Sequence, residues 1–479
     1  MRLLRTSLLV VFVLALVAVP YTRRHLFTAD ALGGFAAFFC GGQVARQGHD
    51  PYRAEPLRAC EQTLPSYRYD VPGVVEPAPF PPVVLAAFGA LSLLPFWWAF
   101  GVYAVLALIA TAFAVWALRR MTGFSPWFVG ASLAVGALYQ NLRFGEIPPL
   151  VIGIVCAAAL LLERGRPRTA ALVALPSLIE PHVAGPVLLA LFLASKPSRA
   201  TLAVAGAVLV VVSVVLLPPL LTAEYFIAAL PAHAAAEVTA NDQYSITWIA
   251  HMLGAPDRWA IRAGSLAYAA TAAFGVLAGK RLATRFARPA FVVVIPAAFS
   301  VIGGLFIHDL QLPIALPAAL LLAAATTGRV RALALAASFG LAVTWFDDFG
   351  AALALAALAV MAWSAPLAFA QPLRRAAFAA SVCAAYACAI LAFHALSPDV
   401  HAALPPQPGV GGAPNELASA VWGRYVRTTP YGWASPRTLA EKLPLFAALV
   451  LLAYAAARAA SAPQRAGALR PEPSSPPSR

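Results

Sequence analysis

Charged side chains are scarce in this sequence. Asp, Glu, Lys and Arg make up 11% of the 479 residues, whereas 61% are hydrophobic and the mean hydropathy is +0.77. So few charges cannot cover the surface of ordinary water-soluble domains. The composition therefore excludes a typical soluble protein and indicates a chain whose main solvent is lipid.

Motifs that bind nucleotides or metals in soluble enzymes are missing. The sequence has no Walker loop, no dinucleotide-binding fingerprint, no His-Glu-x-x-His and no Gly-x-Ser-x-Gly. The net charge of +14 comes from arginines in short clusters at the ends of apolar runs, without a continuous basic face. We therefore expect anionic membrane lipids as partners of these clusters and no nucleic acid.

Cysteine is rare as well, with five residues in the whole chain. Cys156, Cys383 and Cys388 fall in apolar runs, where small buried thiols are common. Cys40 and Cys60 lie in the first long connection, and a disulfide between them is plausible if that connection faces an oxidising compartment. No cysteine spacing matches a zinc site, so we assign no metal ligand and no certain cofactor; a requirement for a divalent metal stays open.

The chain is rich in apolar runs long enough to cross a hydrocarbon core of about 30 Å, and in lipid such runs must be helical. The predicted fold class is an all-α, polytopic transmembrane protein. With every basic cluster on the cytoplasmic side, the runs pair into hairpins and give about 12 to 14 crossings. The expected pairs are 127–142 with 147–163, 169–180 with 182–194, 200–217 with 262–279, 289–306 with 309–326, 331–345 with 350–371, and 376–395 with 440–457. Residues 81–118 are expected to form a surface or re-entrant helix from Pro82 to Pro95 and a crossing from about Trp97 to Leu118.

This topology divides the chain into unequal parts. It predicts a first transmembrane helix in residues 1–20, with a signal peptide as the alternative, and a first outer (periplasmic) loop over 21–80. A multi-helix transmembrane domain follows over 81–461, with outer loops at 218–261 and 396–439, and then a disordered cytoplasmic tail over 462–479. We expect a multi-pass protein of a bacterial inner (plasma) membrane with both termini cytoplasmic and its functional residues outside.

The first outer loop is more organised than a spacer. An acid at Asp30 is followed by an expected short helix that contains aromatic residues, a turn from Gly48 to Tyr52 and a Pro-Pro helix start at Pro81. This arrangement resembles glycosyltransferase family 87, polytopic enzymes of the GT-C superfamily that use polyprenyl-phosphate sugars as donors. The likeness covers residues 20 to about 325. Its further motifs are Phe144–Leu150, similar to a Gly-Gln-Val-Asn-x-Leu helix start, Leu178–His182, similar to Ile-Lys-Pro, Asn241–Ile246, similar to Asn-Gln-Ser-Leu, and Ile307–Leu310, similar to a late His-Asp-Leu.

The sequence departs from the family pattern at three positions. The loop-one aspartate of the family corresponds to Gly34, while the nearby carboxylate is Asp30, about one helical turn earlier. Glu180 stands where the family has lysine, and Glu146 where it has glutamine. A role in phosphate binding does not transfer to these two acids directly.

The resemblance implies a GT-C-like fold with a large first outer loop and a hexosyl- or pentosyltransferase activity. Such an enzyme would move a mannose-like or pentose unit from a polyprenyl-phosphate donor to a lipid or cell-envelope glycan acceptor, with inversion. The alternatives are a transporter or flippase of lipid-linked sugars and a non-catalytic member of the family. Transporters carry ionisable residues near the bilayer midplane, whereas here these residues gather at predicted outer tips.

Inverting transfer needs a carboxylate that takes the proton of the acceptor hydroxyl. Asp30 is the predicted base and Glu76 a weaker alternative, while Asp50 opens an Asp-Pro-Tyr turn and is expected to be structural. The predicted substrate-binding residues are polar groups at or near the outer tips: Arg143, Glu146, Glu180, His182, His233, Glu237, Asn241, Gln243, His308 and Asp309.

Several of these residues have structural alternatives. Arg143 can bind a donor phosphate or pair with Glu146. His233 and Glu237 share a helix face, where they can bind sugar, phosphate or metal, or form a solvated pair. Asn241, Gln243 and Ser245 suit sugar recognition or cap the helix that follows, and Asp309 can cap the helix after His308.

Overall fold

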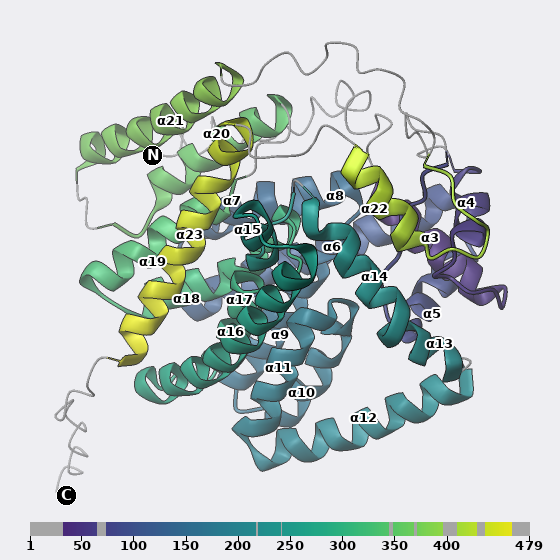
Figure 1. The fold of residues 1–479 in the computed structure, drawn as a ribbon. Coiled ribbons are helices and arrows are strands. Elements are labelled where there is room, and N and C mark those ends of the chain that lie inside the picture. The colour runs from purple at the N-terminus through teal and green to yellow at the C-terminus, as the bar shows by residue number, and fades with distance from the viewer. Residues whose placement is uncertain are drawn as a thin grey trace, which may run out of the picture.

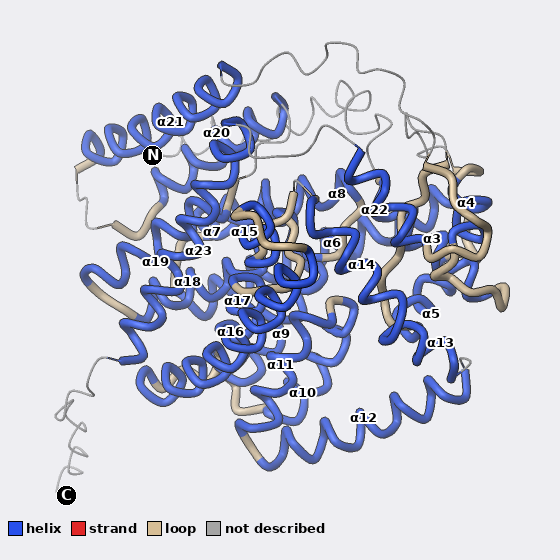
Figure 2. The backbone as a smooth tube through the Cα atoms, viewed as in Figure 1, coloured by secondary structure: helices blue, strands red, loops and turns tan. Residues whose placement is uncertain are grey.

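A computed structural model describes residues 32–64, 73–216, 219–240, 242–343, 348–367, 371–395, 410–428 and 436–461. Within these ranges every regular element is a helix, apart from two isolated β-bridges (Figures 1 and 2). The predicted all-α fold is confirmed. The predicted first transmembrane helix in residues 1–20 and the tail over 462–479 lie outside the described residues.

Five helices of the described chain are long and apolar enough to cross a membrane, which agrees with a polytopic membrane protein. They are α6 (Phe96–Thr122), α12 (Lys196–Leu216), α16 (Asp257–Phe286), α21 (Pro372–Ala395) and α23 (Pro436–Ser461). Shorter apolar helices accompany them: α5 (Pro82–Leu91), α9 (Pro148–Glu163), α10 (Pro167–Ala174) with η2 (Leu175–Ile179), α11 (Pro181–Ala194), α17 (Phe291–Ile302), η5 (Asp309–Ala315) with α18 (Leu316–Ala325), and α20 (Asp348–Ser364). The count of about 12 to 14 crossings stays a prediction.

Burial follows the pattern of a membrane protein. Helices α17 and α18 lie at the centre, where Val294, Ile295 and Leu321 are fully buried. The long helix α6 exposes Trp98 and Ile109, which are 72% and 60% accessible. Large exposed apolar faces of this kind are unfavourable in water and favourable against lipid tails.

Helix α7 (Pro126–Leu133) runs through a π-helical turn, η1 (Ala134–Tyr139), into α8 (Gln140–Phe144). A π-helical turn shifts the register of backbone hydrogen bonds and is frequent at functional sites. The turn packs against η5, and α19 (Gly328–Leu341) packs against α23. The elements α5 and α6 begin where the sequence predicts them, at Pro82 and Phe96.

The described parts of the three predicted outer loops contain helices, including the short helices expected in the first and second loops. The first contains α3 (Gly33–Arg46) and α4 (Ala54–Glu61), and the third contains α22 (Ala418–Thr428). The second contains α13 (Pro219–Glu224), η3 (Tyr225–Ala229), α14 (Leu230–Ala236), η4 (Glu237–Thr239) and α15 (Ile246–Met252).

Parts of the three connections join into one helical layer, which we call the cap: α3, α4, α14 and α22. Helix α22 packs against α14 and α4, and Val421 on α22 belongs to the same buried apolar cluster as Phe35 and Phe39 on α3. Backbone hydrogen bonds run from Ala418 N to Tyr52 O (2.8 Å) and from Ala54 N to Glu416 O (2.8 Å). Segments more than 350 residues apart in sequence therefore cover the same end of the helix bundle.

Candidate functional site

An imidazole between two carboxylates forms the centre of the candidate site. His308 Nε2 lies 3.3 Å from Glu237 Oε2, and His308 Nδ1 lies 3.1 Å from Asp242 Oδ2. An isolated bridge between Gln243 and His308 aligns the two segments, and Asp309 N donates to Asp242 O at 3.1 Å. We call His308, Glu237 and Asp242 the triad.

The charges in the triad support one another. Burial disfavours a charged imidazole, but the carboxylates of Asp242 and Glu237 outweigh it and raise the pKa of His308 well above its usual value. Desolvation likewise opposes ionisation of both acids, yet His308 lowers the pKa of Glu237 and brings that of Asp242 to about 2. At neutral pH the triad therefore holds two carboxylates and one imidazolium, with one net negative charge.

The triad is also the place where a cation would fit. One ligand atom from each of its three residues lies within 4.8 Å of the others, and carboxylate oxygens with an imidazole nitrogen suit a divalent metal. Metal binding would require His308 to lose a proton, because both its ring nitrogens face carboxylates. The protonated imidazole already neutralises one of the two acids, so the geometry does not require a metal.

Glu237 is tied to the cap as well as to His308. Its Oε1 accepts a hydrogen bond of 2.7 Å from Trp422 Nε1 on α22, and its Oε2 accepts one of 3.4 Å from Gln243 Nε2. Glu237 is 3% exposed and His233 is 6% exposed, with the His233 ring edge-on to Phe306. The alternative of a solvated His233 and Glu237 pair is therefore wrong.

Glu180 and His182 form a second polar group beside the triad, in which burial lowers the pKa of His182 to about 4 and keeps its imidazole neutral. Gln311 Nε2 donates to both Glu180 oxygens, at 3.2 and 3.3 Å, and His182 Nδ1 lies 3.2 Å from Glu180 Oε2. Gln311 Oε1 accepts from His308 N at 3.0 Å, so one side chain links the two groups. Burial raises the pKa of Glu180 to about 7, despite the opposing effects of Gln311 and His308.

Glu146 brings a third carboxylate to this region from the turn between α8 and α9. Burial raises its pKa to about 8; the carboxylate of Glu76 adds to the rise and the charge of His308 opposes it. Asn141 fixes the turn, because its carbonyl accepts from Glu146 N at 2.8 Å and its Nδ2 donates to Leu310 O at 3.2 Å. The segment of Glu146 is thus bonded to the segment that follows His308.

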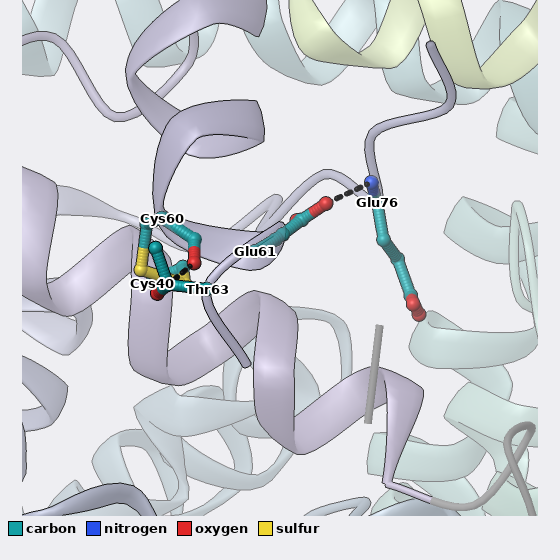
Figure 3. The surroundings of a disulfide bond; sticks show 5 residues. All are labelled: Cys40, Cys60, Glu61, Thr63 and Glu76. Atoms are coloured by element: carbon teal, nitrogen blue, oxygen red, sulfur yellow. Dashed lines mark hydrogen bonds between the residues drawn. A yellow bond between two sulfur atoms is a disulfide. The ribbon is translucent and has the colours of Figure 1, made fainter. Parts of the chain in front are cut away.

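The first connection contributes Glu76, which is positioned through a disulfide. Cys40 on α3 and Cys60 on α4 are joined, with their Cα atoms 5.7 Å apart. Next to Cys60, Glu61 is 1% exposed and its carboxylate accepts from Glu76 N at 3.2 Å, as Figure 3 shows. Burial and the neighbouring Glu76 raise the pKa of Glu61 well above its usual value.

Three predicted site residues have mainly structural contacts. Gln243 is 1% exposed and its Oε1 accepts from Ile307 N at 3.1 Å, while Ser245 caps α15 by accepting from Trp248 N at 3.2 Å. Asp309 is 2% exposed and its Oδ1 accepts from Leu310 N at 2.7 Å. The alternative in which Asp309 is the N-cap residue of the helix is wrong, because His308 occupies the N-cap position of η5 and Asp309 is the first residue of that helix.

The remaining predicted residues are Arg143, Asp30 and Asn241. The Arg143 guanidinium lies over the Phe144 ring, 5.3 Å from the ring centroid. The backbone carbonyl of Arg143 accepts a hydrogen bond from Leu32 N at 2.8 Å. Asp30 and Asn241 lie outside the described residues.

Four residues of the site were not predicted: Asp242, Gln311, Trp422 and Lys442. Lys442 is 2% exposed, donates to the carbonyl of Gln243 and stands over the rings of Tyr244 and Trp248, at 4.1 and 4.4 Å. A single lysine at the start of an apolar run is costly in a membrane, so the sequence alone could have marked Lys442 as a candidate site residue. Trp422 and Gln311 had no comparable signal in the sequence.

An apolar groove approaches the same place from the side of the bundle. Its volume is about 470 Å³, and it lies between α15, α16, α17 and α23. The aromatic residues that line it include Tyr244, the residue covered by Lys442; the others are Phe274, Phe299, Phe446 and Tyr454. The groove therefore joins the apolar bundle to the polar site.

Comparison with known proteins agrees with this geometry. No curated protein and no solved structure matches the chain. The model of one family, Glycosyltransferase family 87, matches residues 79–308, which include Glu146, Glu180 and all three residues of the triad. The match confirms the family predicted from the sequence: residues 79–308, just under half of the chain, match glycosyltransferase family 87, a family of membrane glycosyltransferases.

Proposed function

We propose that this chain moves a mannose-like or pentose sugar from a polyprenyl-phosphate donor to a lipid or cell-envelope glycan acceptor, with inversion at the anomeric carbon. The observation that carries the proposal is the triad: an imidazole held between two carboxylates and connected through Gln311 to Glu180. Segments from separate parts of the chain assemble one charged site beside an apolar groove.

The chemistry is a single displacement. A carboxylate takes the proton of the acceptor hydroxyl while the acceptor oxygen bonds to the anomeric carbon. The bond from that carbon to the phosphate oxygen breaks, and polyprenyl phosphate leaves with the electron pair. The sequence proposes Asp30 as the base. Positive charge that develops on the sugar is stabilised by the surrounding carboxylates. The imidazolium of His308, which stays paired with Glu237 and Asp242, offsets the repulsion between these carboxylates and the departing phosphate.

The groove supports a lipid-linked donor. Aromatic and aliphatic side chains line it, and one of them is Tyr244, whose ring lies under Lys442 and which follows Gln243 in the sequence. A polyprenyl chain in this groove would bring its phosphate end toward the triad. Since the donor carries its own leaving group, no nucleotide pocket is needed, in line with the missing nucleotide motifs.

The disulfide supports a site on the outer side of a bacterial inner membrane. Disulfides persist in oxidising compartments, and Cys40 and Cys60 lie in the connection that carries Glu76. The basic clusters at the opposite ends of the apolar runs give the same orientation, with both termini cytoplasmic.

Reconstitution in lipid vesicles tests this function against transport. The purified protein is supplied with polyprenyl-phosphate mannose and, separately, with polyprenyl-phosphate arabinose, together with cell-envelope lipids as acceptors. We expect cleavage of one donor and a product whose anomeric configuration, measured by NMR, is opposite to that of the donor. Movement of intact donor across the bilayer without cleavage would instead identify a flippase, and retention of configuration would contradict single displacement.

A further inference from the structure

The start of helix α3 is shaped around two carboxylates from other segments. Gly33 and Gly34 leave one side of the helix bare. A Cβ on Gly34 would lie 2.9 Å from the Glu146 Cδ and still closer to its Oε1, and a Cβ on Gly33 would lie 2.8 Å from Glu76 Oε2. The volume next to the first turn of α3 is therefore filled by the two acids, with Glu146 against Gly34.

The backbone holds Glu146 against this turn. Gly145 has a φ of +76°, and a Cβ on it would lie 2.9 Å from Phe35 N, so the tight turn before Glu146 presses on α3. The carbonyl of Glu146 accepts from the Tyr103 hydroxyl, and its N–H donates to Asn141 O. Contacts with three separate helices fix the position of this residue.

Glu146 differs from most of the acids nearby in its access to a substrate; Glu76 is also partly exposed, but it lies against Gly33 and not against Gly34. Glu61, Glu180 and Glu237 are each less than 5% exposed and bonded to protein groups, whereas the side chain of Glu146 is partly exposed. Asp242 is more exposed, but it is paired with His308. Glu146 is thus fixed at its backbone and reachable at its carboxylate.

We infer that Glu146 is the catalytic base, the carboxylate that takes the proton of the acceptor hydroxyl; this inference rests on the proposed function. As the acceptor oxygen bonds to the anomeric carbon, the proton moves to Glu146, and the electron pair of the broken bond leaves with polyprenyl phosphate. Glu146 takes this role in place of Asp30.

The electrostatic surroundings suit this role. Burial, together with the charges of Glu76, Glu180 and Asp242 and against the charge of His308, raises the pKa of Glu146 to about 8. Tyr103 faces the same turn from α6. A base works best when its pKa lies near the operating pH.

Substitutions at positions 146 and 34 test the inference in the same vesicle assay, with both donors. Glu146→Gln should lower kcat by about 100-fold or more, as expected for loss of a general base. Binding of undecaprenyl phosphate should change by less than about twofold, since the uncharged variant keeps the shape of the site. Glu146→Asp should keep part of the activity.

Moving the carboxylate from position 146 to position 34 is the matched control for its loss at position 146. Glu146→Gly empties the volume beside Gly34, and adding Gly34→Asp to it returns a carboxylate there. We expect this double variant to exceed Glu146→Gly by about tenfold or more, while Glu146→Gly with Gly34→Asn stays inactive.

Two results would overturn the assignment. One is a Glu146→Gln enzyme within about threefold of wild type. The other is loss of activity in Asp30→Asn with Glu146→Gln still active. If wild type itself cleaves neither donor, the proposed function fails, which is a different result from an active wild type with an active Glu146→Gln variant.

Discussion

The carboxylate of Glu146 fills the space in which a side chain on Gly34 would lie, with its Cδ 2.9 Å from the position of a Cβ. The two residues are more than 100 positions apart: Gly34 lies on α3, and Glu146 lies in the turn between α8 and α9. Because the volume is shared, a change at one position acts directly on the other. The first prediction follows from this relationship.

Gly34→Ala should impair the enzyme through Glu146. The added methyl group must displace the carboxylate, and overpacking of this kind costs about 1–3 kcal/mol. We expect a transfer rate at least about tenfold lower, since a small misplacement of a catalytic group is costly. Gly101→Ala is the control, because a Cβ on Gly101 would have no heavy atom within 4 Å. Equal rates for the two variants would refute the predicted coupling.

The same relationship links two departures of the sequence from the family pattern. The pattern has an aspartate at the position of Gly34 and a glutamine at the position of Glu146. Read separately, each departure weakens the resemblance. In three dimensions the carboxylate of Glu146 occupies the volume beside Gly34, and the proposed role of Glu146 as base would make the two departures compensate.

Glu76→Gln should shift the pH dependence of transfer. The negative charge of Glu76 raises the pKa of Glu146, so its removal lowers that pKa. A base is active when deprotonated, and the acid limb of the rate profile should therefore move to lower pH. The measurement is kcat between pH 5 and 9 for both proteins. An acid limb that stays in place or moves to higher pH would argue against Glu146 as the titrating group.

The helices of the bundle could be predicted from the sequence, whereas the cap could not. Long apolar runs give α6, α9, α11 and the combined η5 and α18 nearly at their observed bounds, because lipid forces such runs to be helical. Helix α22 is short and mixes Trp422 and Tyr425 with arginines, so it has no comparable apolar signal. Its fold depends on packing against α14 and α4.

The candidate site shows the same limit. His308, Glu237 and Glu180 stood out in the sequence as ionisable residues beside apolar runs, which are costly in a membrane and often functional. Their partners did not, because the pairing of Asp242 with His308 and of Gln311 with Glu180 depends on how distant segments lie together. Residue type can be read from sequence, but proximity cannot.

Loss of the disulfide should weaken both stability and transfer. Cys40→Ser leaves α4 without its covalent link to α3, and native disulfides typically contribute about 2–4 kcal/mol. Glu61, beside Cys60, would then hold the backbone of Glu76 less firmly. Thermal unfolding in detergent and the transfer rate are measured, with Cys388→Ser as the control at an exposed free cysteine. A Cys40→Ser protein as stable and active as the control would contradict this role.

Glu180 should make stability depend on pH. Burial raises its pKa from the usual 4.5 to about 7, so the folded state holds a proton that the unfolded state releases. This contribution is fully present below pH 4.5 and is lost as the pH rises through 7. The free energy of unfolding is measured from pH 4.5 to 7.5. Its decrease over this range should be about 2–3 kcal/mol smaller in Glu180→Gln than in wild type. An unchanged slope would show that Glu180 is ionised throughout.

The release of polyprenyl phosphate from radiolabelled donor, measured for wild type and for His308→Asn, tests the central claim most directly. Asparagine removes the cation that lies between Glu237 and Asp242. We predict that wild type releases polyprenyl phosphate only when acceptor is present and that His308→Asn releases it at least about 100-fold more slowly. Equal release by both proteins, or no release by wild type from either donor, would contradict the account.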